Sequence, residues 1–464
     1  EEKKMRFRKR LLSGLIAGIL VIGTVGMNVD AAKIQVDQQI PAEEVDSVYN
    51  QEVDSNALAG WPVGPNIYSE SGIVMDSGAI LYAKKIDDQH YPASITKILT
   101  ALVALENSQL TDRVKFTQNC IDFLEYGDAH IGMKVGEEIS MEDALYGMLL
   151  ASANEVSYAI ANSVNGGYDN FINMMNEKVT ELGGTNSHFV NANGLHNDEH
   201  YTSAHDMALI GSAVFKYEEF RKITGTRQYT IGPTALTSES RTFQQNHKML
   251  FQGNRNYYEY CVGGKTGYTD QALTTLVTFA TKDDKNLVAV TLRVHGGGQN
   301  AYVDTRAMLD YAFDNFSKVP ITKECVTEDD VESVEESSYV MLPSGVTLDK
   351  LDVALQKPAE LGDKKGYLTY FYEGQEVGKV PVMVTEKCYN KIHGIEAKNL
   401  KKETPKSEKG IPIVVKIVLI TAIVIILLVT ILISVLTYKR KKRIEQRKRA
   451  RMRRRRRNAE QRNH

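Results

Sequence analysis

The stretch Pro92–Lys97, with the sequence PASITK, most constrains how this chain folds, because it places two reactive side chains on one predicted helix. Pro92 suits a first helical turn, where the N–H that proline lacks would have no partner. Apolar residues recur downstream at helical spacing and mark a buried face. Ser94 and Lys97 are three residues apart, so we expect their Cβ atoms about 5–6 Å from each other. A serine becomes a nucleophile when a base removes its proton, and a neutral lysine can be this base.

The charge of the chain is distributed very unevenly. The 464 residues carry a net charge of −2 and are enough for two or three domains. Residues 1–10 carry +4, residues 439–464 carry +13, and the rest of the chain carries −19. Two basic ends around an acidic middle indicate a chain whose segments lie in different compartments. The same distribution argues against a nucleic-acid partner.

The N-terminal residues have the pattern of a secretory signal peptide. Six Lys or Arg residues in 1–10 precede the apolar run Leu11–Met27, and small residues follow at Val29–Ala32. This order of charge, apolar run and small-residue site predicts a signal peptide over residues 1–32. If it were not cleaved, the same segment would be a membrane anchor.

The C-terminal residues predict a membrane anchor. Ile417–Tyr438 is an uncharged run of 22 residues, which as a helix spans about 33 Å and matches a hydrocarbon core of about 30 Å. We therefore expect a linker over 396–410, a transmembrane helix over 411–438 and a basic tail over 439–464. By the positive-inside rule the tail lies in the cytoplasm, against lipid headgroups, and the acidic middle lies outside.

The order of patterns between these ends indicates an α+β domain and then a small β-rich domain. Residues 33–58 are polar and acidic and predict a flexible lead-in. Short strands over 71–75 and 79–83 form a predicted hairpin, a mostly helical middle follows, and strands over 274–281 and 287–294 precede a helix over 300–316. We expect the first and last strands to share one antiparallel sheet within a domain over 59–317. Alternating apolar runs predict the β-rich domain over 318–395.

The four cysteines, Cys120, Cys261, Cys325 and Cys388, are far apart in the sequence. They contain no C-x-x-C pair, so the sequence predicts no zinc site, and it calls for no other metal or cofactor. Cys325 and Cys388 could form a disulfide in an oxidising exterior, and the sequence leaves this pairing open.

Two further polar motifs follow the first one. Ser152-x-Asn154 lies between two predicted helices, where small polar residues usually serve as caps. Lys265-Thr266-Gly267 lies in a glycine-rich stretch before a predicted hairpin. A phosphate-binding loop would need a glycine where Glu259 stands, so we reject that interpretation.

The three motifs in this order are typical of penicillin-binding proteins and serine β-lactamases. Within that superfamily the chain resembles the D-alanyl-D-alanine carboxypeptidases, the low-molecular-mass penicillin-binding proteins, from about Trp61 to Phe316. Two positions depart from the family pattern: Asn193 stands where histidine is frequent, and Leu273 stands where glycine is frequent.

The resemblance implies a β-lactamase/transpeptidase-like α+β domain, with helices on both faces of an antiparallel sheet and a helical subdomain. It implies an acyl-enzyme mechanism in which Ser94 attacks the terminal D-Ala–D-Ala bond of peptidoglycan stem peptides and Lys97 is the general base. Ser152 relays the proton to the leaving amine, and Asn154 binds the substrate amide and orients Lys97. For Lys97 to be neutral near pH 7, its pKa must fall from about 10.4.

The third motif is expected to bind the substrate. Lys265 and Thr266 would hold the terminal carboxylate, and Gly267 lets the strand approach closely. The resemblance implies an oxyanion hole formed by the backbone N–H groups of Ser94 and Tyr268. The same chemistry would let β-lactams acylate Ser94.

Other functions use related sites. A class A β-lactamase needs a glutamate on a loop before the third motif, and Glu181-Leu182 followed by two glycines matches it poorly. A non-catalytic cell-wall binding protein with a relict site is a second alternative. Transpeptidation or endopeptidase action on cross-links is a third alternative, which the sequence separates poorly from carboxypeptidase action.

Overall fold

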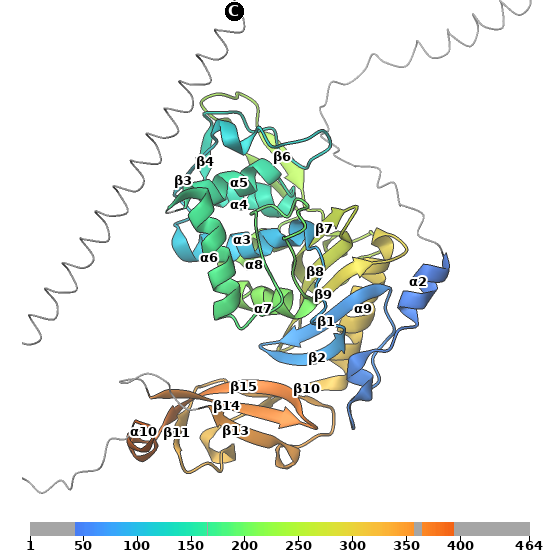
Figure 1. Cartoon of the computed structure of the whole chain (residues 1–464), viewed down its shortest axis with the longest axis vertical. Helices are drawn as coiled ribbons and strands as arrows, with labels where there is room; N and C mark the ends of the chain where they lie inside the picture. Colours follow the sequence, from blue (N-terminus) through green and yellow to red (C-terminus); the bar gives the residue numbers. More distant parts are fainter. Residues whose placement is uncertain (1–41, 165, 357–363, 394–464) are drawn as a thin grey trace, which may run out of the picture. The chain divides into compact units, whose positions relative to one another are not determined.

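The computed structural model describes residues 42–164, 166–356 and 364–393. Figure 1 shows these residues as a helical part, a mixed sheet-and-helix part and a β-rich part. The α-helices are α2 Ala42–Tyr49, α3 Lys97–Asn107, α4 Met141–Leu150, α5 Asn154–Ser163, α6 Gly167–Glu181, α7 Ala204–Val214, α8 Glu218–Gly225, α9 Gly298–Asn315 and α10 Glu386–Ile392. The first nine strands are β1 Ser69–Asp76, β2 Ala79–Lys84, β3 Arg113–Lys115, β4 Glu138–Ser140, β5 Gln228–Ile231, β6 Arg241–Gln244, β7 Cys261–Thr269, β8 Leu273–Lys282 and β9 Lys285–Val294. The later strands are β10 Phe316–Pro320, β11 Val331–Val334, β12 Tyr339–Pro343, β13 Asp352–Gln356, β14 Lys365–Tyr372 and β15 Gln375–Val384.

The central sheet joins the start and the end of the region predicted to form the α+β domain. Its five strands lie in the order β2-β1-β9-β8-β7, and every neighbouring pair is antiparallel. Ile73 of β1 pairs with Val290 of β9, more than 200 positions later in the chain. The predicted α+β class and the shared antiparallel sheet are therefore confirmed, and β7 is left as an edge strand.

Both faces of this sheet are covered by helices. Ile73 and Met75 belong to the apolar cluster that includes α7, whereas Val74 belongs to the cluster that includes α9. Successive side chains of a strand point to opposite faces, so the near-continuous apolar runs of β1 and β9 supply two cores at once. The sheet is thereby held rigidly from both sides, which fixes the position of its edge strand β7.

The helical part is formed by α3, α4, α5 and α6. Ser140 begins α4 as the sequence predicts, because its Oγ accepts a hydrogen bond from the Asp143 backbone N–H at 3.0 Å. α3 is buried along most of its length between α7, α6 and α5. The first turn of α3 and the junction between α4 and α5 are therefore held in one core, which brings the first two motifs together.

The predicted β-rich region contains the strands β11 to β15, and β10 begins just before it. β11, β15, β14 and β13 form one antiparallel sheet, and β10 pairs with β12. The Trp61 ring lies 5.2 Å from the Phe316 ring and 6.3 Å from the Tyr372 ring. The Tyr339 hydroxyl donates a hydrogen bond to Asp76 at 2.6 Å. In the part of the chain that the structure describes, Cys325 and Cys388 are not joined by a disulfide, and the first is exposed and the second buried.

The predicted flexible lead-in over 33–58 is wrong for its second half. Residues 42–49 form α2, and a short 3₁₀ turn follows at Asp54–Ala57. A distant side chain anchors the end of α2: the buried Lys84 ammonium donates hydrogen bonds to the carbonyls of Val48, Ile67 and Ser69 at 2.8–2.9 Å. Polar composition around residues 42–58 does not reveal this long-range contact.

Several predicted segments lie outside the described residues. They are the signal peptide over 1–32, the first part of the lead-in, the linker over 396–410, the transmembrane helix over 411–438 and the basic tail over 439–464. Among the residues that the structure describes, no helix combines the length and the apolar character needed to span a membrane.

Candidate active site

Ser94 lies on a tight turn directly before a buried helix. The sequence predicts that the α-helix starts at Pro92, but residues Ala93–Thr96 form a 3₁₀ turn and α3 starts at Lys97. Ala93 has a φ of 50°, and its carbonyl lies so close to Gly194 that a Cβ there would be 1.9 Å from the carbonyl oxygen. This close contact tightens the first turn, and it leaves Ser94 only partly buried at the start of the helix.

Lys97 is a fully buried lysine whose hydrogen-bond partners are all defined. Its Nζ lies 2.9 Å from Ser94 Oγ and 2.8 Å from Asn154 Oδ1, and it also donates to the backbone carbonyl of Asn193. Burial, together with the nearby charge of Lys265, holds the pKa of Lys97 well below its usual range. A neutral amine keeps two donors for Asn154 and Asn193 and has a lone pair for the Ser94 proton.

Ser152 and Lys265 form a second pair. Ser152 lies between α4 and α5 with a φ of 62°, a conformation that non-glycine residues adopt only where the surroundings impose it. Lys265 Nζ donates to Ser152 Oγ at 3.0 Å and to the Thr266 carbonyl at 2.7 Å. Burial lowers the pKa of Lys265 to about 7. Its ammonium group is therefore available near neutral pH but is easily lost at higher pH.

The glycine of the third motif lets β7 pass directly beside Ser94. A Cβ at Gly267 would lie 2.9 Å from the Ser94 nitrogen and 2.4 Å from Thr275 Oγ1. Thr275 on β8 also donates to the carbonyl of Pro92 at 2.8 Å. The edge of the sheet and the Ser94 turn are thus joined by direct contacts, with room for glycine alone.

The structure brings all three motifs into one region. Ser94, Lys97 and Asn154 share one hydrogen-bonded group, and Ser152 and Lys265 share another. These two groups are joined by the short segment from Ser152 to Asn154. The remaining predicted residues, Thr266, Gly267 and Tyr268, follow on β7. Among the described residues, no group of three or more His, Cys, Asp or Glu side chains is placed to hold a metal ion.

Sequence reasoning did not assign roles to several neighbours of these side chains. The Asn193 carbonyl accepts from Lys97, so the position noted as a departure from the family pattern contributes through its backbone. The buried Glu155 carboxylate accepts from the Ile131 N–H at 2.8 Å, while the Asn154 N–H donates to the Ala129 carbonyl at 2.8 Å. Together these two bonds attach a surface loop to the start of α5. In the sequence, the signal for this contact is Glu155, an acidic residue directly after the second motif.

Comparison with known proteins agrees with this geometry. Residues 59–296 match the family model described as D-alanyl-D-alanine carboxypeptidase. The chain belongs to this family. The resemblance predicted from the three motifs is therefore confirmed, and with it the prediction of a serine-type D-Ala-D-Ala carboxypeptidase.

Individual relatives cover much of the chain. The D-alanyl-D-alanine carboxypeptidase DacF of Bacillus subtilis is 28% identical over 336 residues, which are 68% of this chain and 84% of the relative. DacB2 of Mycobacterium tuberculosis is 31% identical over 252 residues, which are 52% of this chain and 79% of the relative. The crystal structure of the Streptomyces K15 DD-transpeptidase aligns with a TM-score of 0.50 and 27% identity, covering 55% of this chain and 100% of that chain. This similarity confirms the transpeptidase-like α+β fold.

Replacing Gly267 should disrupt the Ser94 turn. We expect Gly267→Ala to lower the rate of acylation by labelled penicillin at least about 100-fold, because an added Cβ displaces the Ser94 N–H or the strand beside it. Gly232→Ala is the matched control, since no atom lies within 4 Å of a Cβ there. A Gly267→Ala protein that reacts at the normal rate would show that the close contact is unimportant.

Lys97 and Lys265 should have opposite effects on how the acylation rate depends on pH. The acylation rate should rise with pH as Lys97 loses its proton, and should fall above about pH 7 as Lys265 becomes neutral. Lys265→Gln should move the rising limb to higher pH, because the neighbouring positive charge that lowers the pKa of Lys97 is removed. The exposed Lys216→Gln variant should keep the normal profile. A rising limb that does not move in Lys265→Gln would contradict the coupling between the two lysines.

Proposed function

We propose that this chain removes the terminal D-alanine from peptidoglycan stem peptides ending in D-Ala-D-Ala, through an acyl-enzyme on Ser94. One observation carries the assignment of the nucleophile: the buried Lys97 amine, with its lowered pKa, lies 2.9 Å from Ser94 Oγ. This is the hydrogen-bond distance that a general base needs. A serine without such a base would be unreactive near neutral pH.

The acylation step follows from the two hydrogen-bonded groups. Lys97 takes the proton of Ser94 as Oγ attacks the carbonyl of the penultimate D-alanine. The negative charge that develops on the carbonyl oxygen would be stabilised by the N–H groups of Ser94 and Tyr268. As the peptide bond breaks, Ser152 passes a proton to the leaving amine of D-alanine, and Lys97 supplies its proton in turn. Water then hydrolyses the ester and regenerates Ser94.

The third motif is proposed to hold the substrate. β7 is an edge strand, so an extended peptide can add to it through backbone hydrogen bonds. Lys265 and Thr266 would bind the terminal carboxylate, and Asn154 would donate its amide to the substrate carbonyl. β-Lactams place a strained amide and a carboxylate in the same arrangement, which supports their acylation of Ser94.

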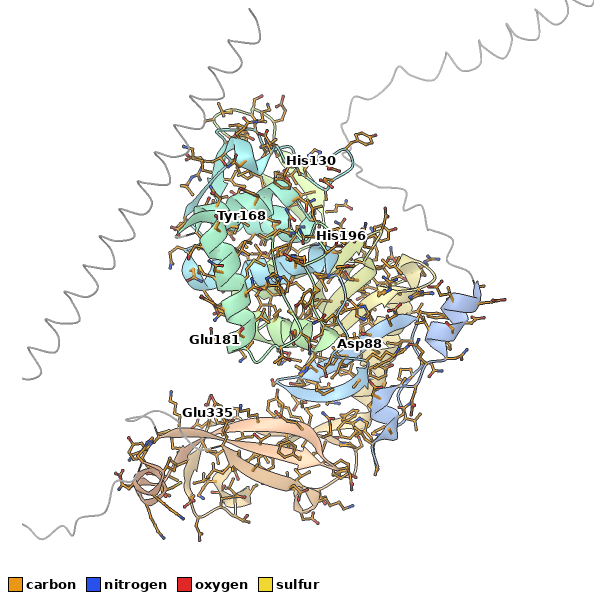
Figure 2. The ribbon with its side chains drawn as sticks, viewed as in Figure 1. Asp88, His130, Tyr168, Glu181, His196 and Glu335 are labelled. Atoms are coloured by element: carbon orange, nitrogen blue, oxygen red, sulfur yellow. The ribbon has the colours of Figure 1, made fainter. Side chains whose placement is uncertain are left out.

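The β-lactamase alternative gains no support from the loop glutamate. Glu181 ends α6, is largely exposed and pairs with Lys178 at 2.6 Å, and Figure 2 shows it at the end of that helix. Transpeptidation stays a second candidate, because the similar structure from Streptomyces K15 is named a DD-transpeptidase. The two reactions differ in whether water or an amine accepts the acyl group.

The proposed mechanism requires Ser94. We expect the full chain in detergent to release D-alanine from an N-acyl-L-Lys-D-Ala-D-Ala peptide and to form one penicillin adduct on Ser94, and we expect Ser94→Ala to lose both. The exposed Ser317→Ala variant should retain both. Adduct turnover within seconds would favour a β-lactamase, and transfer to an added D-amino acid would favour a transpeptidase. Release of D-alanine by Ser94→Ala would refute the assignment.

We also propose that the catalytic part lies on the outer side of the cytoplasmic membrane. The basic tail would lie on the cytoplasmic side and contact the lipid headgroups there. This proposal is supported by the apolar runs 11–27 and 417–438 and by the basic residues beside each run. A labelled penicillin that does not cross membranes should react with Ser94 in intact cells. Labelling that requires permeabilised cells would contradict this orientation.

A further inference from the structure

Two peptide units lead into Ser94, and a threonine hydroxyl holds the carbonyl of each one. Thr275 Oγ1 donates to the Pro92 carbonyl at 2.8 Å, and Thr96 Oγ1 donates to the Ala93 carbonyl at 2.9 Å. The second contact bears directly on the site, because the Ala93 carbonyl and the Ser94 N–H belong to the same peptide unit. The mechanism above gives no role to Thr96, although it lies two residues from Ser94.

The direction of the Ala93 carbonyl fixes the direction of the Ser94 N–H. A peptide unit is planar, and in the trans form its C=O and N–H point in opposite directions. The described residues contain no cis peptide bond. Ser94 lies in the first turn, so the turn itself has no acceptor for its N–H. The contact that holds the carbonyl therefore sets where this N–H points.

Thr96 is itself held by a buried histidine that is far away in the sequence. His200 is 1% exposed, and its ring packs edge-on against Phe189 at 5.3 Å. Its Nδ1 accepts from the Val190 N–H at 3.1 Å, and its Nε2 lies 2.9 Å from Thr96 Oγ1. Burial lowers the pKa of His200 to about 3, so the ring is neutral near pH 7.

The donor and the acceptor of each hydrogen bond in this series are determined. A neutral imidazole has one donor and one acceptor, and the Val190 N–H can only donate, so Nδ1 is the acceptor and Nε2 carries the proton. Nε2 therefore donates to Thr96 Oγ1. The hydroxyl has a single proton, which goes to the Ala93 carbonyl. The series of bonds begins at the Val190 N–H and ends on the peptide unit that carries the Ser94 N–H.

The Thr96 contact differs from the local bond that threonines often make in helices. Such a bond needs no distant partner, whereas Thr96 is fully buried and accepts from His200, 104 positions away. Ala93 has a φ of 50°, and its carbonyl is also in tight contact with Gly194. The Gly194 N–H donates in turn to Asn191 Oδ1 at 2.7 Å. One distant segment thus holds the strained peptide unit at two points.

We propose that His200 and Thr96 are positioning residues that aim the Ser94 N–H at the oxyanion during acylation and hydrolysis. The inference rests on the proposed function and explains how one donor of its oxyanion hole is oriented. An N–H stabilises the developing charge only when it points at the oxygen, so rotation of this peptide unit weakens that bond. Binding before the reaction depends on it less, because the carbonyl oxygen carries little charge at that stage.

The first test removes the Thr96 hydroxyl with little change in side-chain shape. In the full chain in detergent, Thr96→Val should lower the first-order rate of acylation by penicillin at least about tenfold, while the dissociation constant of the complex that precedes acylation changes less than about threefold. Thr96→Ser keeps the hydroxyl and should stay within about threefold of the wild-type acylation rate. Thr305→Val is the matched control, because it removes another buried threonine hydroxyl, one that has no hydrogen-bond partner among the described residues.

A double variant tests whether His200 acts through Thr96. His200→Phe removes both ring nitrogens but keeps an aromatic ring, and it should lower the acylation rate about three- to tenfold. In the variant that combines His200→Phe with Thr96→Val, the loss should equal that of Thr96→Val alone within about twofold, since the threonine that transmits the effect is already missing. Losses that multiply would show that the two residues act separately and would overturn the proposal.

The penicillin adduct provides a measurement that a purely structural role does not change. Its ester carbonyl would occupy the oxyanion hole, and hydrogen bonds to this oxygen lower the carbonyl stretching frequency in infrared difference spectra. The band should lie at higher frequency in Thr96→Val and in His200→Phe than in the wild type, and it should not shift in Thr96→Ser or Thr305→Val. Only molecules that have folded and reacted contribute to the band, so poor folding of a variant does not obscure the result.

Any one of three results would overturn the inference while the proposed function stands. They are an unshifted carbonyl band in Thr96→Val and His200→Phe, a normal acylation rate in Thr96→Val, and an equal weakening of binding and acylation in that variant, which would indicate general damage to the site. If the wild-type protein forms no penicillin adduct on Ser94 and releases no D-alanine, the proposed function itself fails.

Discussion

The burial of two lysine side chains close to one serine turn is the constraint on which the rest of this structure depends. A buried ammonium group is costly unless it is paired or loses its proton, and Lys97 and Lys265 are both fully buried. Each has defined hydrogen-bond partners: Lys97 contacts Ser94 and Asn154, and Lys265 contacts Ser152. Because the two charges repel, the favoured state has one neutral amine and one cation. The serine beside the neutral amine is the one that can be activated.

Such an arrangement needs a rigid surround. Ser152 has a left-handed backbone conformation, and so does Ala93 directly before Ser94. Conformations of this kind cost free energy and persist where packing imposes them. Here the packing comes from the buried α3, from Gly194 against Ala93, and from the doubly covered sheet that carries β7. The strained backbone lies at Ser152 and directly before Ser94, and the surrounding core stabilises it.

The unpaired edge of the central sheet is part of the candidate site. An unpaired edge strand usually invites unwanted pairing with other chains. In this protein the edge strand β7 passes beside Ser94, and Gly267 lets the two backbone segments come close together. Under the proposed function, the same edge would set the direction of an added peptide.

The amino-acid sequence by itself determined the features that depend on near neighbours. The Ser94–Lys97 contact follows from a three-residue spacing, the Ser140 cap from a local pattern, and the hairpin of β1 and β2 from alternation around a turn. Family resemblance added the link between the three motifs, which no local rule provides. The order of α+β elements was also readable, since strands and helices differ in the period of their apolar residues.

Tertiary structure alone decided the rest. The helix over residues 42–49 is anchored by the ammonium group of Lys84, far along the chain, which donates a hydrogen bond to the carbonyl of Val48. The lowered pKa of Lys97 depends on burial by other segments, and the pairing of Arg293 with Glu70 joins positions 223 apart. These properties depend on distance and dielectric environment between remote residues. Composition and spacing specify neither the distances nor the dielectric environment, so these properties are fixed only in the folded chain.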